Sequence, residues 1–176
     1  FYTILAMMVI MVAGRIRRVL GAGGGLAAAR ALRARDEGGP ALCVQGLQIP
    51  ELDDRLETPS MRAFTDTPLW NRPNAEWSWK HYLGPDRQGE VSPYAAPARA
   101  TDLAGLPPAY VSVMEFDPLR DEGIEFYRLL LRAGQPAQCR NVMGTSHGTE
   151  IAVHMCPDIS RQTAASIAQF LREVSA

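Results

Sequence analysis

Residues 115–123 read EFDPLRDEG and residues 144–148 read GTSHG, and these two segments decide the predicted fold class. Each comes directly after a predicted strand, the first after residues 109–116 and the second after residues 137–143. Between them lies a helical pattern that ends at Gly134. Strands that alternate with helices in this way predict an α/β fold, with a mostly parallel sheet and helices on both of its faces.

Asp117 and His147 come at the carboxyl ends of two neighbouring predicted strands. In an open parallel sheet, functional groups gather at this rim because the loops there converge on one crevice. A carboxylate at this position accepts the Nδ1 proton of a nearby imidazole, and the imidazole takes a proton from a nucleophile at Nε2. Taken singly, the aspartate is interpreted as a helix cap and the histidine as structural. Their spacing and context favour instead the acid and the base of a Ser-His-Asp triad.

The nucleophile of such a triad has no serine in its expected place. It would follow a predicted strand over residues 15–20 and precede a glycine-rich helix start, where residues 19–24 read VLGAGG. A Gly-x-Ser-x-Gly pattern does occur at residues 144–148, but the triad order requires an acid and then a histidine downstream of the serine. Asp158 is the only aspartate after Ser146, and no histidine follows it. We therefore reject this serine as the nucleophile.

The remaining pattern predicts one α/β domain over residues 1–176 with a long excursion between strands. The excursion, residues 48–108, holds most of the prolines and all three tryptophans, and it shows little sustained periodicity. Its helix-spaced aromatic residues are interpreted as core, with an acyl or alcohol pocket as the alternative. The other predicted elements are a helix over 22–37, a strand over 41–47, a solvated turn over 53–57, a helix over 74–83 and a final helix over 158–174. A further helix is predicted to be capped by Asp121 and to run to Ala133, with ion pairs among residues 120–122 at its start.

Composition and charge bear on the binding partners and the cellular compartment expected for the chain. With 47% hydrophobic and 21% charged residues and a net charge of -1, the chain gives no reason to expect a nucleic-acid partner. Three widely spaced cysteines favour reduced thiols and a cytoplasmic setting over a disulfide framework, and no zinc-type pairing is present. The apolar run over residues 1–13 is too short to span a membrane, and positive charges follow it, so it is interpreted as a buried strand or helix.

The glycine-rich residues 21–26 permit a second interpretation, a dinucleotide-binding start in which backbone N–H groups at a helix N-terminus meet a pyrophosphate. The match is poor because Leu26 stands where the third glycine belongs. The next acids, Asp36 and Glu37, lie inside the predicted helix and not at the end of a second strand. Close packing of the helix against a strand is the structural alternative for the same glycines.

Several segments together resemble the hormone-sensitive-lipase-like carboxylesterases, and within that family the bacterial heroin esterase branch: residues 23–29, 31–38, 49–55, 105–110, 117–122 and 144–148. The DPLRDE run is the specific part, and the resemblance covers about residues 22–174. It implies the C-terminal portion of an α/β-hydrolase fold, acting on a small-molecule carboxylic ester without a cofactor. It also implies Asp117 as the triad acid, His147 as the general base, and a homodimer joined through the strand near residues 137–143.

Two departures from the family pattern bear on activity. Aligned through the glycines, the family's Gly-x-Ser-Ala-Gly-Gly places Gly21 at the nucleophile position, and Ala22 after it offers one oxyanion-hole N–H. The family's upstream His-Gly-Gly-Gly loop has no counterpart in this sequence. We expect the chain as written to be nearly inert towards esters, because loss of the nucleophile removes most of the catalytic acceleration.

Two hypotheses account for the missing serine. The resemblance stops upstream of Ala22, which suggests a frameshift or a truncation that affects residues 1–21. The alternative is a non-catalytic interaction module, in which the strand near residue 15 is an exposed edge that pairs with another chain.

Overall fold

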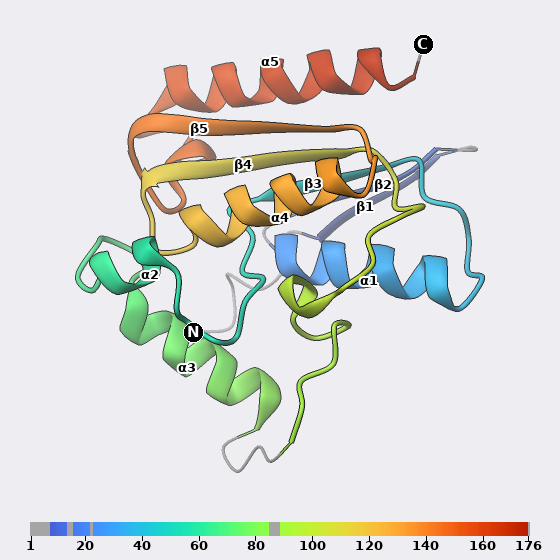
Figure 1. Cartoon of the computed structure of the whole chain (residues 1–176). Coiled ribbons are helices and arrows are strands. Elements are labelled where there is room, and N and C mark those ends of the chain that lie inside the picture. Colours follow the sequence, from blue (N-terminus) through green and yellow to red (C-terminus); the bar gives the residue numbers. More distant parts are fainter. Residues whose placement is uncertain (1–7, 14–15, 22, 85–88, 176) are drawn as a thin grey trace.

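The computed structural model describes residues 8–13, 16–21, 23–84 and 89–175, with backbone alone for the first two ranges. A five-stranded sheet crosses the molecule in the order β1-β2-β3-β4-β5 (Figure 1). The strands are β1 (Met8–Ala13), β2 (Ile16–Gly21), β3 (Val44–Gln48), β4 (Ala109–Phe116) and β5 (Ala137–Ser146). The pair β1–β2 is antiparallel, and the pairs from β2 to β5 are parallel.

Helices cover both faces of this sheet, as the sequence predicts. The helices α1 (Gly24–Asp36) and α4 (Arg120–Arg132) lie on one face, and α5 (Pro157–Glu173) lies on the other (Figure 1). Successive side chains of β4 point to opposite faces of the sheet, as they do in any β-strand. Val111 belongs to the core beneath α1 and α4, whereas Tyr110 packs with Phe170 of α5. The predicted α/β class, a mostly parallel sheet with helices on both faces, is confirmed.

Two details of the predicted sheet are wrong. The strand near residue 15 is not an exposed edge, because β1 pairs with β2 on its outer side. The last parallel strand, predicted to end at residue 143, continues to Ser146 with a register shift opposite Met114 and Phe116. The longer strand places His147 directly at the strand end.

The start of α4 differs from the prediction as well. The N-cap residue is Leu119 and no side chain caps the helix, so the prediction that Asp121 is the cap is wrong. Asp121 lies in the first helical turn, where its carboxylate accepts hydrogen bonds from the backbone N–H of Ser60 at 2.7 Å and from Arg120 Nε at 2.8 Å. An acid in the first turn is favourable for a helix without capping it, and here it also ties α4 to α2 (Pro59–Ala63).

The glycines at the start of α1 are required by a close backbone approach. A Cβ atom on Gly24 would lie 2.7 Å from Pro50 Cβ, and one on Gly25 would lie 1.9 Å from the carbonyl oxygen of Glu51. The first turn of α1 therefore sits directly on the loop that follows β3. This contact supports the packing interpretation of the glycine-rich run.

The excursion between β3 and β4 contains α2, α3 (Arg72–Leu83) and a 3₁₀ turn over Pro97–Arg99. It packs partly in small apolar clusters, one of which joins Met61 and Ala75 of the excursion to Leu119 at the start of α4. The turn over residues 53–57 was expected to be solvated, but Asp53 and Asp54 are both buried. Each accepts a hydrogen bond from an arginine: Asp54 from Arg99 Nε at 2.5 Å and Asp53 from Arg55 Nε at 2.7 Å.

Candidate active site

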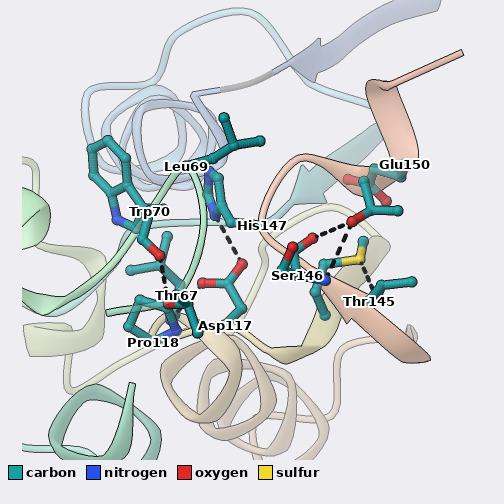
Figure 2. Close-up of polar contacts among 12 residues, drawn as sticks. Thr67, Leu69, Trp70, Asp117, Pro118, Thr145, Ser146, His147 and Glu150 are labelled. Carbon is teal, nitrogen blue, oxygen red and sulfur yellow. Dashed lines mark hydrogen bonds and ion pairs between the residues drawn. The ribbon is translucent and has the colours of Figure 1, made fainter. Parts of the chain in front are cut away.

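Asp117 and His147 meet at the carboxyl ends of β4 and β5 (Figure 2). The imidazole Nδ1 lies 2.8 Å from Asp117 Oδ2. A carboxylate only accepts hydrogen bonds, so the Nδ1–H donates. The other carboxylate oxygen accepts from the backbone N–H of Leu119 at 2.9 Å, and the side chain is 1% exposed. Both oxygens of the carboxylate are thereby fixed, and Nε2 is the ring nitrogen that can take a proton from a third group.

The strand register explains why these two residues meet. Phe116 pairs with Ser146 across β4 and β5, so the next residue of each strand leaves the sheet at the same level. The chain then reverses at Gly148, which adopts φ 77°, a left-handed conformation that glycine tolerates. Thr149 holds this turn: its Oγ1 donates to the carbonyl of Ser146 at 2.7 Å. The backbone of Ser146 thus takes part in the turn beside His147, since its N–H also donates to Thr149 Oγ1 at 3.2 Å.

The position expected for the nucleophile lies at the end of β2. Gly21 is the last residue of that strand and pairs with Leu47 of β3, and α1 begins three residues later at Gly24. This is the strand-turn-helix arrangement that the sequence predicted for the nucleophile. Ala22, the candidate oxyanion-hole residue, lies outside the described residues. Within the described part of the chain, no serine or cysteine forms a hydrogen bond with His147.

Two carboxyl groups near the pair were not predicted from the sequence: Glu51, which is half-buried, and Glu150, which is buried. Burial raises the pKa of Glu51 to about 7, although a hydrogen bond from Ser78 Oγ at 2.8 Å and the field of His147 oppose the shift. Burial also raises the pKa of Glu150 to about 7, against a hydrogen bond from Ser112 Oγ at 3.2 Å and the field of His147. Both carboxyl groups are therefore close to half protonated near neutral pH.

Glu122, expected at the helix start in an ion pair, is buried instead. Its Oε1 accepts hydrogen bonds from the backbone N–H groups of Leu52 at 2.6 Å and Asp53 at 3.3 Å. Burial raises the pKa of Glu122 well above the ordinary value for a glutamate, against the two backbone hydrogen bonds. Glu122 joins the DPLRDE motif to the loop that carries Glu51. The same loop supports the first turn of α1, so one buried carboxyl group links both sides of the candidate site.

The tryptophans of the excursion divide between core and site. Trp79 is buried in the core of the excursion, and Trp77 is exposed on α3, where it stacks on His81. Trp70 stacks on His147 with ring centroids 5.4 Å apart and an angle of 25° between the rings. The core interpretation therefore holds for Trp79 and is wrong for Trp77, while Trp70 belongs to the site.

The described residues contain no group of three or more histidine, cysteine, aspartate or glutamate side chains placed to hold a metal ion. None of the helices in the described ranges combines the length and the apolar character that crossing a membrane requires.

The fold, the paired acid and imidazole, and the strand-turn-helix before α1 agree with the match to known proteins. The alpha/beta hydrolase fold family matches residues 10–156, and the chain belongs to this family. The match begins upstream of Ala22, so the expectation that the resemblance stops there is wrong.

The relatives of this chain within the alpha/beta hydrolase fold family include named esterases. Esterase LipI of Mycobacterium tuberculosis is 40% identical over 128 residues, which are 72% of this chain and 40% of LipI. Carboxylesterase NlhH of the same organism is 34% identical over 159 residues, 88% of this chain and 49% of NlhH. Among solved structures, Bacterial Heroin Esterase is 53% identical with a TM-score of 0.83, and the match covers 89% of this chain and 50% of that one. The chain is esterase-like by family, and it spans about half or less of the length of these relatives.

Glu150 gives a prediction for the pH dependence of stability. Its folded-state pKa of about 7 lies above the ordinary value of 4.5, so between these pH values the folded chain retains a proton that the unfolded chain has released. The free energy of unfolding therefore falls as pH rises from 4.5 to 7, by up to about 3 kcal/mol for this group. Glu150→Gln cannot ionise, so its stability is expected to fall less over the same window.

Urea unfolding at a series of pH values measures this effect. Glu90→Gln is the control, because Glu90 is exposed and its variant is expected to follow the wild-type profile. Parallel profiles for wild type and Glu150→Gln would show that Glu150 carries no such shift.

Proposed function

We propose that this chain carries the acid and base of a carboxylic-ester hydrolase, with Asp117 as the triad acid and His147 as the general base. The observation that supports this most is the 2.8 Å contact between His147 Nδ1 and Asp117 at the carboxyl rim of the sheet. The family match and the esterase relatives supply the reaction class. The substrate proposed on these grounds is a small-molecule carboxylic ester.

The chemistry follows from the geometry of the pair. Asp117 holds the imidazole in the tautomer with hydrogen on Nδ1, which leaves the lone pair on Nε2. The imidazole takes the proton of a hydroxyl as that oxygen attacks the ester carbonyl, and it returns the proton to the leaving alcohol. Asp117 stabilises the imidazolium that forms between these two steps.

Glycine at position 21 supplies no oxygen for this attack. We propose that the chain with Gly21 turns over esters very slowly, and that a serine at this position restores a nucleophile. The reasons are the place of Gly21 at the end of β2 and the start of α1 after it, where family members carry serine.

Covalent labelling tests this proposal directly. A fluorophosphonate reacts with a serine only when a base activates the hydroxyl. We expect Gly21→Ser to gain one phosphonyl group by mass spectrometry, while the chain with Gly21 gains none. The double variant Gly21→Ser/His147→Gln removes the base and should stay unlabelled. A folded Gly21→Ser chain that resists the reagent, or one that is labelled as fast without His147, would contradict the proposal.

A non-catalytic role as an interaction module is the second candidate, and the outer side of β5 favours it. β5 is the last strand of the described sheet, and large apolar side chains are exposed on it and on the segment after it, with Met143 81% and Met155 84% exposed. An unpaired edge with apolar side chains suits pairing with a second copy. Sedimentation of the purified chain, compared with Met143→Arg, tests whether it forms a homodimer.

We also propose a cytoplasmic setting, because Cys139 and Cys156 are thiols and not disulfide-bonded. Localisation of a tagged chain in cell fractions tests this.

A further inference from the structure

His147 is restrained by more than its hydrogen bond to Asp117. That bond fixes the Nδ1 edge of the ring, but a histidine ring still has a broad range of χ2 rotation. The indole of Trp70 lies against the face of the imidazole, with centroids 5.4 Å apart and a 25° angle between the planes. This arrangement is a stacked aromatic pair, and it restricts the tilt that the hydrogen bond leaves open (Figure 2).

The turn that carries Trp70 is itself firmly held. Thr67 Oγ1 donates to the carbonyl of Trp70 at 2.7 Å, and the N–H of Trp70 donates to the carbonyl of Pro68 at 2.8 Å. Leu69 between them adopts φ 66°, a left-handed conformation that costs a non-glycine residue about 1–2 kcal/mol. Asn74 Nδ2 stabilises it by donating to the carbonyl of Leu69 at 3.1 Å. Backbone strain of this kind is often found at functional sites.

The turn also fits closely against the segment of the imidazole. A Cβ atom on Gly148, the neighbour of His147, would lie 3.4 Å from Leu69 Cδ1. On its other side, Trp70 packs against the cluster that contains Met61 and Leu119. Leu119 is the residue whose N–H fixes Asp117. One apolar cluster therefore supports both the indole and the carboxylate that hold the imidazole.

The indole N–H takes no part in this arrangement. Trp70 Nε1 is buried and has no hydrogen-bond partner among the described residues. A buried donor without a partner costs stability. The favourable contribution of tryptophan at this position therefore comes from the contact of its ring face with the imidazole.

We propose that Trp70 is a positioning residue that fixes the plane of the His147 imidazole against Asp117. This inference rests on the proposed function, because the plane of the ring matters for catalysis only if His147 is the base. Its physical content is the orientation of the ring, which can be measured without turnover.

The test is the hydrogen-exchange rate of the His147 Nδ1 proton, observed by NMR in the chain as it stands. Trp70→Leu removes the ring face and is expected to speed this exchange about 5- to 10-fold, the factor that corresponds to one aromatic pair. Trp70→Phe loses one of the two fused rings and the unpartnered N–H but keeps an aromatic face, so its exchange rate should stay closer to wild type than that of Trp70→Leu. Thr67→Val keeps the indole but loses its anchor, and its exchange rate should fall between those of wild type and Trp70→Leu.

Trp77→Leu is the matched control. Trp77 stacks on His81 with centroids 5.5 Å apart and an angle of 24°, almost the same geometry, on the exposed surface of α3. Trp77→Leu should leave the exchange rate of the His147 Nδ1 proton unchanged. Unchanged exchange in both Trp70→Leu and Thr67→Val would overturn the proposal, and if Trp70→Leu does not fold, Thr67→Val alone decides.

A second readout connects the ring orientation to catalysis. In the Gly21→Ser background, Trp70→Leu is expected to lower kcat for a short-chain aryl ester about 10-fold, with KM nearly unchanged, because orientation of the base acts in the transition state. A rise in KM with kcat unchanged would assign Trp70 to substrate binding and overturn the positioning role. If Gly21→Ser is inactive, the proposed function fails, while the exchange measurement still tests the role of Trp70.

Discussion

Gly25→Ala is expected to destabilise the folded chain by about 3 kcal/mol or more, although alanine is the better helix former by about 1 kcal/mol. The added Cβ would lie 1.9 Å from the carbonyl oxygen of Glu51 and 3.0 Å from its carbonyl carbon. Both are backbone atoms, so no side-chain rotation relieves the overlap. The loop cannot yield easily either, because Glu122 binds the N–H groups of Leu52 and Asp53 immediately after it. The measurement is the free energy of unfolding in guanidinium chloride.

Gly23→Ala is the matched control for this prediction. Gly23 is the N-cap of the same helix with φ -152°, and a Cβ there would meet its nearest neighbour, Leu26 Cδ1, at 3.7 Å, an ordinary contact. Because glycine is a better N-cap residue than alanine, this variant is expected to lose about 1 kcal/mol or less, well below the loss in Gly25→Ala. Equal stability of the two variants would mean that α1 does not sit on the loop as described. The contact also ties the start of α1 to α4, because Glu122 of α4 binds the same loop.

The sequence predicted that Asp117 and His147 meet, because both residues are placed by local signals. Asp117 follows a strongly apolar strand and His147 follows the next, and parallel strands bring such ends to one rim. A longer β5 than predicted did not disturb this, because the strand simply continues to the residue before His147. The parallel sheet and its covering helices were predictable for the same reason.

The buried carboxyl groups could not be predicted, because burial of a charged residue type depends on segments far apart in the chain. Glu122 contacts Leu52 from 70 residues away, and Glu150 contacts Ser112 from 38 residues away. A glutamate in the first turn of a helix has the same sequence signal whether it faces water or a loop. The Asp121 error has a similar origin, since an acid near a helix start fits a cap and a first-turn residue equally well.

The contact of Trp70 with His147 escaped prediction because the excursion has no periodic pattern that shows where it runs. Helix spacing correctly indicated the core position of Trp79. Trp70 lies in the turn before α3, where no spacing rule applies, and its direction is set by the left-handed Leu69. A leucine followed by tryptophan gives no sign of that conformation, since left-handed backbone usually selects glycine or asparagine.

Asp117→Asn is expected to slow the reaction of a Gly21→Ser chain with short-chain aryl esters by about 10³- to 10⁴-fold. The amide has nearly the same shape as the carboxylate, but its nitrogen donates where the carboxylate accepts. An amide donor facing Nδ1 favours the imidazole tautomer with hydrogen on Nε2, which cannot take a proton from the serine. The carboxylate also stabilises the imidazolium from a site that is 1% exposed, and a neutral amide does not replace that charge.

Steady-state turnover measures this loss, and NMR of the Nδ1 proton gives a second observation that does not depend on turnover. The proton bound between His147 and Asp117 should be detectable in the wild-type chain and absent in Asp117→Asn. Asp158→Asn is the control, because Asp158 is exposed on α5 and its loss should change neither measurement. If Asp117→Asn retained both the proton and the rate, the 2.8 Å contact would have no bearing on proton transfer, and His147 would be a base without an acid partner. A lost proton with an unchanged rate would instead place the base elsewhere in the chain.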